Sequence, residues 1–156
     1  MKRFFTALVA MTMAVCAHAQ FEEGKMYAGA SLSGFDLSYN GSKELSLGIQ
    51  AKAGYMAADN LMVLGEAGFQ HEGNAFQVGV GGRYYITQNG IFLGANCKFV
   101  HASHNYNDLM PGVEVGYAFF ISHTVTIEPS IYYQQSFKKH SDYSTIGLKL
   151  GFGIYL

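Results

Sequence analysis

Seven charged residues fall on the same side of an alternating pattern that recurs through this chain. They are Lys52, Glu66, Arg83, Lys98, Glu114, Glu128 and Lys149. Charged groups that leave water need partners, so four cations and three carboxylates on one face predict ion pairing. Lys52 and Glu66 lie at similar distances from a turn between them, and we expect them to meet. Arg83 is expected on the strand next to that of Glu66. Lys149 is expected on the strand next to that of Glu128.

Histidines form a second group with binding chemistry. Four of them, with two aspartates, fall in hydrophilic segments that we expect on one external rim: His71, His101, His104, His140, Asp108 and Asp142. Imidazole nitrogens and carboxylate oxygens are zinc ligands. A metal site also needs fixed geometry and supporting hydrogen bonds, which hydrophilic loops do not supply. We therefore expect neither a metal nor a cofactor.

The elements that position the charges show a period of two residues. In the last thirteen residues, S-T-I-G-L-K-L-G-F-G-I-Y-L, large apolar residues alternate with glycines, Lys149 and Tyr155. A period of two indicates a β-strand. An apolar exterior with a small, polar interior is typical of transmembrane β-barrel strands.

The same alternation recurs in strand–turn–strand repeats, and it predicts an eight-stranded barrel. The expected strands are 25–37, 44–56, 61–71, 75–86, 91–101, 112–121, 124–134 and 144–156. Three connections are tight turns and the other four are mostly longer and hydrophilic, as in outer-membrane barrels. An even strand number places both termini on the periplasmic side. We expect the last strand to pair with the first near residues 27–33, which leaves no exposed edge.

The opposite face of these strands carries no charge, as lipid contact requires. Aromatic residues near the strand ends predict interfacial girdles, with Tyr55, Tyr84, Phe119 and Tyr155 on the turn side. Pro129 falls on the lipid face, where it removes a backbone donor. We expect a β-bulge there.

Residues 1–19 predict a cleaved signal peptide, with a basic start, an apolar run and the Ala17-His18-Ala19 cleavage site, so the barrel domain is 20–156. Cys16 leaves a lipoprotein alternative, although Val15 is bulkier than a lipobox residue usually is. Removal of the peptide leaves eight basic and eleven acidic residues, a net charge of −3 without a basic patch. We expect no nucleic-acid partner. The single remaining cysteine, Cys97, excludes an internal disulfide.

The sequence resembles the small eight-stranded outer-membrane β-barrel proteins, the OmpX/OmpA-type and porin-family barrels of Bacteroidota. The resemblance covers about residues 20–156 and rests on R-Y-Y-I-T-Q-N-G-I-F-L-G, G-Y-A-F-F and G-L-K-L-G-F-G-I-Y-L. It implies an all-β, antiparallel, up-and-down barrel that is monomeric in the outer membrane among lipids and lipopolysaccharide. It also implies a C-terminal signal for the barrel assembly machinery, with Leu156 where an aromatic residue is usual. The signal positions are Leu148, Leu150, Phe152, Ile154 and Leu156.

Eight strands enclose an interior just wide enough for side chains. The nearly balanced charges therefore predict a closed, ion-paired lumen and a non-enzymatic structural or surface-interaction role. Loops 102–111 and 136–143 would carry surface contacts. The expected contact residues are Tyr106, Lys138, Lys139, His140 and Tyr143.

Two alternatives stay open. Transport of a small hydrophobic molecule through a lateral opening is one, although the charged lumen argues against it. The other rests on a loose resemblance to barrel lipid A deacylases, which implies Ser103 as nucleophile, His101 as base and Glu114 as its orienting group. The family's serine is usually followed directly by asparagine, whereas His104 intervenes here, and Glu114 has lumen parity.

Overall fold

The computed structural model describes residues 21–38, 43–44, 48–70, 75–86, 90–102, 106–137 and 144–156. The predicted signal peptide and Cys16 lie outside these residues. The strands are β1 (Met26–Ser38), β2 (Lys43–Glu44), β3 (Gly48–Ala58), β4 (Leu61–Gln70), β5 (Ala75–Tyr85), β6 (Ile91–Ala102), β7 (Tyr106–Tyr117), β8 (Phe119–Phe120), β9 (Val125–Gln134) and β10 (Thr145–Tyr155). Among the described residues, no helix is long and apolar enough to cross a membrane.

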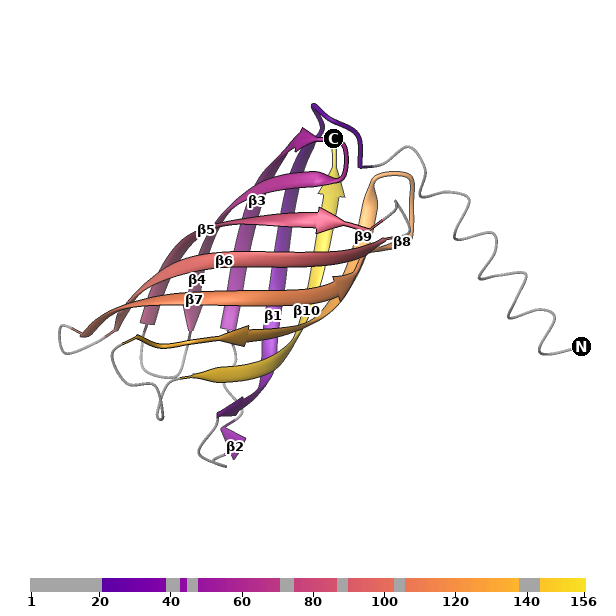
Figure 1. Ribbon diagram of the computed structural model, residues 1–156. Coiled ribbons are helices and arrows are strands. Elements are labelled where there is room, and N and C mark those ends of the chain that lie inside the picture. Colours follow the sequence, from indigo (N-terminus) through magenta and orange to yellow (C-terminus); the bar gives the residue numbers. More distant parts are fainter. Residues whose placement is uncertain are drawn as a thin grey trace, which may run out of the picture.

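The strands form one antiparallel sheet that closes on itself (Figure 1). Its order is β10-β1-β3-β4-β5-β6-β7-β9-β8, and β10 also pairs with β9. Because β2 and β8 have two residues each, eight long strands make the wall. The first and last strands pair from Tyr27↔Tyr155 to Ser38↔Thr145, so the predicted closed eight-stranded barrel is confirmed.

Strict alternation decides which side chains enter the barrel. Along β10, Ile146, Leu148 and Leu150 are exposed on the outside, whereas Gly147 and Lys149 are buried inside. The other long strands alternate in the same sense, with apolar residues outward. An isolated soluble sheet would bury its apolar face, so this inverted pattern is that of a barrel whose exterior contacts lipid.

The two ends of the barrel differ, and we name them by their connections. The turn end holds the β3–β4, β5–β6 and β8–β9 turns, and the loop end is the opposite end, where β1, β4, β6 and β9 end. Asn60 has a φ of 64° and Gly90 a φ of 90° in two of the turns. The start of β1 and the chain's C-terminus lie together at the turn end (Figure 1), where Met26 and Leu156 exchange backbone hydrogen bonds of 3.0 and 2.8 Å.

The largest difference from prediction is the sixth long strand, β7. It begins at Tyr106 rather than at residue 112, so most of the expected loop 102–111 is strand. Pro111 accounts for the difference, because a proline usually marks the boundary of a strand and here lies inside one. Residues 106–111 pair with β6 but not with β9, whose ladder with β7 starts at Gly112↔Gln134. A proline is tolerated where one side of the strand has no ladder to complete.

The expected bulge at Pro129 is wrong. Pairing of β9 with β10 keeps one register through Leu150↔Pro129. On the other side of β9 the ladder stops after Gly116↔Ser130 and resumes, in the same register, at Phe119↔Ile127. The Ala118 N–H in this gap donates to the Gly90 carbonyl at 2.8 Å. The missing donor is therefore accommodated by a break between β7 and β8, without an inserted residue.

Candidate functional site in the barrel lumen

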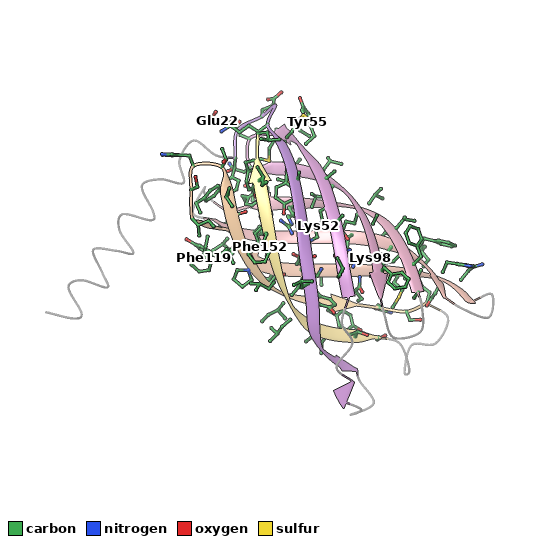
Figure 2. All side chains as sticks on the ribbon, turned by 180° about the vertical axis from the view of Figure 1, so that it is seen from behind. Glu22, Lys52, Tyr55, Lys98, Phe119 and Phe152 are labelled. Atoms are coloured by element: carbon green, nitrogen blue, oxygen red, sulfur yellow. The ribbon has the colours of Figure 1, made fainter. Side chains whose placement is uncertain are left out.

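The seven charged residues expected on one face all lie inside the barrel. Each is at most 6% exposed, and they come from seven different long strands: Lys52, Glu66, Arg83, Lys98, Glu114, Glu128 and Lys149. Figure 2 shows Lys52 and Lys98 within the barrel, whereas Tyr55 and Phe119 project from its outside. Alternation along each strand produces this separation, since successive side chains point to opposite faces.

Arg83 forms ion pairs with carboxylates on two strands that are not adjacent to its own. Its Nη1 lies 2.6 Å from Glu128 Oε2, and its Nη2 lies 3.1 Å from Glu114 Oε1. The planar fork of a guanidinium suits two carboxylates at once, which a lysine ammonium would not match. The Arg83 guanidinium carbon also lies 4.2 Å from the centre of the Phe92 ring. A cation–π contact of this kind adds stabilisation in a desolvated site.

Glu114 is shared by three cations. Besides Arg83, it lies 3.4 Å from Lys52 Nζ and 3.2 Å from Lys149 Nζ. Lys149 Nζ also lies 4.6 Å from the centre of the Tyr132 ring. The carboxylate thus offsets charges from strands on several sides of the barrel, and its oxygens are engaged in ion pairs.

Glu128 has one cation and several hydroxyl partners. The hydroxyls of Tyr27 and Thr126 each donate to it at 2.9 Å, and Tyr155 donates at 3.4 Å. Hydrogen bonds to an ionised oxygen are stronger than those between neutral groups. This set of donors offsets the cost of removing the carboxylate from water.

Glu66 anchors a second group nearer the loop end. Lys52 stands directly opposite it in the β3–β4 ladder, with Nζ 3.8 Å from Oε1. Lys98 Nζ lies 3.8 Å from Oε2, although its strand is not adjacent to β4. Gly79 lies between them in register, and a Cβ there would come within 2.9 Å of the Lys98 side chain. Glycine therefore lets Lys98 pass over β5 to Glu66.

The expected strand neighbours are present, since β5 lies next to β4 and β10 next to β9, but the ion pairs do not follow them. Lys52 does meet Glu66, but Arg83 pairs with Glu128 and Glu114 rather than with Glu66. Lys149 pairs with Glu114 rather than with Glu128. Long side chains in a narrow barrel reach across the lumen, so strand adjacency does not decide the partner.

An eighth charged residue, Asp108, lies inside the barrel and was missed. It is 4% exposed, shares the parity of Glu114 on β7, and accepts a hydrogen bond from the Ser136 hydroxyl. With it, the described side chains of the lumen include four cations and four carboxylates. The expected place of Asp108 on the external rim is therefore wrong, because β7 extends through Asp108 and Pro111. The alternation Asp108, Met110, Gly112, Glu114 was the signal that could have found it.

A second interior layer, of aromatic and apolar side chains, fills the turn end. It contains Phe21, Tyr27, Met56, Met62, Leu64, Tyr85, Phe92, Ala118 and Tyr155, with Phe120 packed against it. Tyr155 therefore points inward and is not part of the lipid-facing girdle, which corrects that expectation; Tyr55, Tyr84 and Phe119 are exposed outside. Phe21 was missed because it precedes the first strand and belongs to no alternating pattern.

The residues of the deacylase alternative do not come together. Glu114 is buried in the lumen, whereas His101 is exposed on the outside, with Nδ1 2.6 Å from Asn107 Oδ1. Ser103 lies outside the described residues. The wall of the barrel thus separates the expected orienting group from the expected base.

The rim group considered for metal binding is also divided. Asp108 faces the lumen and His101 the exterior, and the other four members lie outside the described residues. Within the part of the chain that the structure describes, no three His, Cys, Asp or Glu side chains gather where they could hold a metal ion.

The remaining residues that we predicted from the sequence lie on the outer face, at the start of β7 or outside the described residues. The five proposed assembly-signal positions, Leu148 to Leu156 at every second residue, are all exposed on the outside of β10 and just beyond it. Cys97 lies on the outer face and is partly exposed, without a disulfide partner. Tyr106 begins β7, whereas Lys138, Lys139, His140 and Tyr143 lie outside the described residues.

Comparison with known proteins extends these observations. The family model described as "Outer membrane protein beta-barrel domain" matches residues 5–156. No curated protein sequence matches the chain significantly. Among solved structures, the N-terminal β-barrel domain of Pseudomonas aeruginosa OprF is similar at 12% identity, with a TM-score of 0.69, covering 86% of this chain and 98% of that one.

Two further solved barrels are similar. Neisserial surface protein A matches at 15% identity with a TM-score of 0.56, covering 85% of this chain and 97% of that one. The Yersinia pestis outer membrane protein Ail matches at 17% identity with a TM-score of 0.52, covering 86% of this chain and all of that one. At these identities the likeness shows the fold alone.

Proposed function

This chain belongs to the outer membrane protein β-barrel domain family, and from that premise we propose that it is a closed, non-enzymatic barrel with a structural or surface-interaction role. It is a protein of the bacterial outer membrane with buried ion pairs inside the barrel. The finer role is our proposal, because the family's fold supports many functions.

One observation carries the proposal, namely that the lumen is filled by two successive layers. The ion-pair layer joins four cations to the carboxylates of Glu66, Glu114 and Glu128, and every one of these described side chains is buried. The aromatic layer closes the turn end with fully buried rings such as Phe92 and Tyr85. An eight-stranded barrel has little interior space beyond its side chains, so these layers leave no wide aqueous path.

Planar-bilayer recording of the purified, refolded chain tests this proposal. We expect negligible single-channel conductance at moderate salt concentration. The matched control is Arg83→Ala combined with Phe92→Ala, which empties part of each layer and should raise the frequency of open events. A stable, large open state of the unsubstituted chain would contradict the closed lumen.

We also propose that both termini face the periplasm and that β10 carries the assembly signal. The lipid-facing exposure of Leu148 to Leu156 supports this role, since a recognition signal for assembly must be accessible before the wall closes. Leu156→Phe should leave assembly unchanged or improve it, and Phe152→Asp should reduce the folded fraction in outer-membrane preparations. An epitope placed before Phe21 should be accessible only after the outer membrane is opened.

A surface-interaction role would be carried by the loop end. Lipids and lipopolysaccharide would surround the wall, and an extracellular ligand would contact loop 136–143. Replacing residues 138–143 with a short Gly/Ser linker should abolish partner binding without loss of the folded barrel. Retained binding in that variant would exclude the loop as the contact surface. We propose that the chain acts as a monomer.

Lateral transport of a hydrophobic molecule has less support than a structural or surface-interaction role. The β7–β9 ladder, from Gly112↔Gln134 to Gly116↔Ser130, is the shortest between two long strands of the wall. However, the Gln135 N–H donates to the Pro111 carbonyl at 2.9 Å beyond the ladder, and the lumen behind it is charged. A charged lumen does not favour an apolar ligand.

A further inference from the structure

The segment that precedes β1 reaches back into the barrel. Phe21 is 0% exposed, although it lies five residues before the first strand, whereas Glu22, Glu23 and Gly24 are exposed at the turn-end rim. Figure 2 shows Glu22 at this rim, close to the end of the barrel where Tyr55 lies. The apolar ring of Phe21 is thus the one side chain of residues 21–24 that is buried.

The ring of Phe21 packs against three parts of the wall. It stacks on Tyr85 of β5 with ring centres 3.9 Å apart and planes at 15°. It also makes edge contacts with Phe120 of β8 at 5.5 Å and with Tyr155 of β10 at 5.6 Å. Since β5 is not adjacent to β8 or β10, the ring fills the space between separate strands. Aromatic pairs of this geometry add to the stabilisation from burial.

Backbone hydrogen bonds hold the segment in place. The Asn60 N–H donates to the Phe21 carbonyl at 2.9 Å, and the Gly24 N–H donates to the Met56 carbonyl at 2.9 Å. The Glu23 N–H donates to Asp59 Oδ1 at 3.0 Å. Gly24 has a φ of 91°, a conformation that L residues rarely adopt, so the chain turns inward at a glycine. These bonds attach the segment to Asp59 and Asn60 of the β3–β4 turn and to Met56 near the end of β3.

We propose that residues 21–25 are a removable cork, whose Phe21 ring closes the turn end of the lumen independently of the ion-pair network. The cork is held by the Phe21 ring contacts and by hydrogen bonds to residues 56–60, and it can open while the barrel stays closed, because local openings cost less than global unfolding. The aromatic layer around Phe21 meets the ion-pair network where Tyr27 and Tyr155 bond to Glu128 at 2.9 and 3.4 Å and where the Phe92 ring lies 4.2 Å from the Arg83 guanidinium carbon. This inference rests on the proposed closed lumen and adds a gated entrance at one end of it.

Cysteine labelling of the refolded chain 20–156 tests the cork. Met62→Cys, in a Cys97→Ala background, places a thiol in the buried cluster that contains Phe21. With Phe21 present, we expect a small polar methanethiosulfonate to label this site slowly. Phe21→Ala removes the ring that covers the site, so the reagent no longer depends on a local opening. It should therefore raise the labelling rate at least about tenfold. Phe21→Leu should keep most of the protection.

Two further variants separate the cork from a general loosening of the barrel. Ser31→Cys places a thiol in the lumen beside Gln50, away from the aromatic layer, and its labelling should be unchanged by Phe21→Ala. Gly24→Val retains Phe21 but strains the turn, and no atom lies within 4 Å of the added Cβ. It should accelerate Met62→Cys labelling by an intermediate factor. Only the heat-modifiable, folded band is analysed, by mass spectrometry.

The outcomes are distinguishable. Equal labelling of the Met62→Cys site with and without Phe21 would overturn the cork. Parallel acceleration at the Ser31→Cys site would also overturn it, because the two closures would then not be independent. Conductance of the unsubstituted chain would contradict the closed lumen, on which the cork rests. Equal labelling with and without Phe21 in a chain that shows no conductance would overturn the cork and leave the closed lumen standing. Failure of the proposed function and failure of the cork therefore give different results.

Discussion

Arg83 Nη1 donates a hydrogen bond of 2.6 Å to Glu128 Oε2, although the two residues lie on β5 and β9, which are not neighbours in the barrel wall. The ion pair therefore crosses the lumen, and a second bond from Arg83 to Glu114 at 3.1 Å ties β7 to the same guanidinium. Gly94 lies between Arg83 and Glu114 in register, and a Cβ there would lie 3.4 Å from the Glu114 side chain and 3.6 Å from that of Arg83. A single cation thus joins three strands from inside.

Arg83→Met should lower the free energy of unfolding by about 3–5 kcal/mol, the usual cost of breaking a buried pair by removing one partner. Glu114 would keep Lys52 and Lys149, but Glu128 would keep only hydroxyl donors. Urea unfolding in detergent, followed by far-UV circular dichroism, measures the change, since the chain lacks tryptophan.

The double variant Arg83→Met with Glu128→Gln provides the control. Because it removes both charges of the pair, it should be more stable than the sum of the single effects predicts. Glu22→Gln, on the exposed rim, should change stability by less than about 0.5 kcal/mol. Strict additivity of the two lumen substitutions would contradict a direct Arg83–Glu128 interaction.

Substitution by alanine should have opposite effects on stability at two glycines, Gly153 and Gly65. At Gly153, inside the barrel, a Cβ would lie 2.5 Å from the Tyr27 ring and 2.7 Å from both Glu128 Oε1 and Thr126 Oγ1. Overpacking of this kind should cost about 1–3 kcal/mol. At Gly65, on the outer face, the nearest atom is 3.9 Å away, so alanine should be neutral or stabilise by up to about 1 kcal/mol. Urea midpoints compare the two, and equal effects would contradict the assignment of the faces.

A charge on the outer face should be costly in proportion to its depth. Val80 lies in the middle of β5 and is strongly exposed, so Val80→Arg in lipid vesicles should cost about 2–4 kcal/mol. Ile121 is equally exposed but lies in the turn after β8, where Ile121→Arg should cost about 0–1 kcal/mol. A cost that does not depend on depth would mean that this face does not contact a bilayer.

Substitution of Glu114 should lower the stability of the barrel, whereas substitution of His101 should not. Glu114→Gln should lower stability by several kcal/mol, because three buried cations lose their shared carboxylate. His101→Ala should leave the free energy of unfolding within about 0.5 kcal/mol of the unsubstituted value, since the side chain is exposed.

The unsubstituted chain should release no acyl group from lipid A when the reaction products are analysed by mass spectrometry. Release that is lost in both His101→Ala and Ser103→Ala would instead establish the deacylase alternative.

The sequence allowed the strands and their faces to be predicted because side-chain direction in a strand is a local property. Alternation along β10 placed Lys149 inside and Leu148 outside without knowledge of any partner strand. The β3–β4 pair was also predictable, because the short turn aligns Lys52 with Glu66. The same local signals failed at Pro111 and Pro129, since the cost of a proline depends on which side of the strand carries a ladder.

By itself, the sequence determined that the chain is an eight-stranded barrel with an apolar exterior and a charged interior. Only the tertiary structure decided which charges meet, because closure of the sheet brings β5 opposite β9 and lets Arg83 reach Glu128 across the lumen. It also decided that Asp108 lies inside the barrel and that Phe21 packs against Tyr85 at the turn end. Both depend on distances between segments that are remote in the chain, which no periodicity within one strand records.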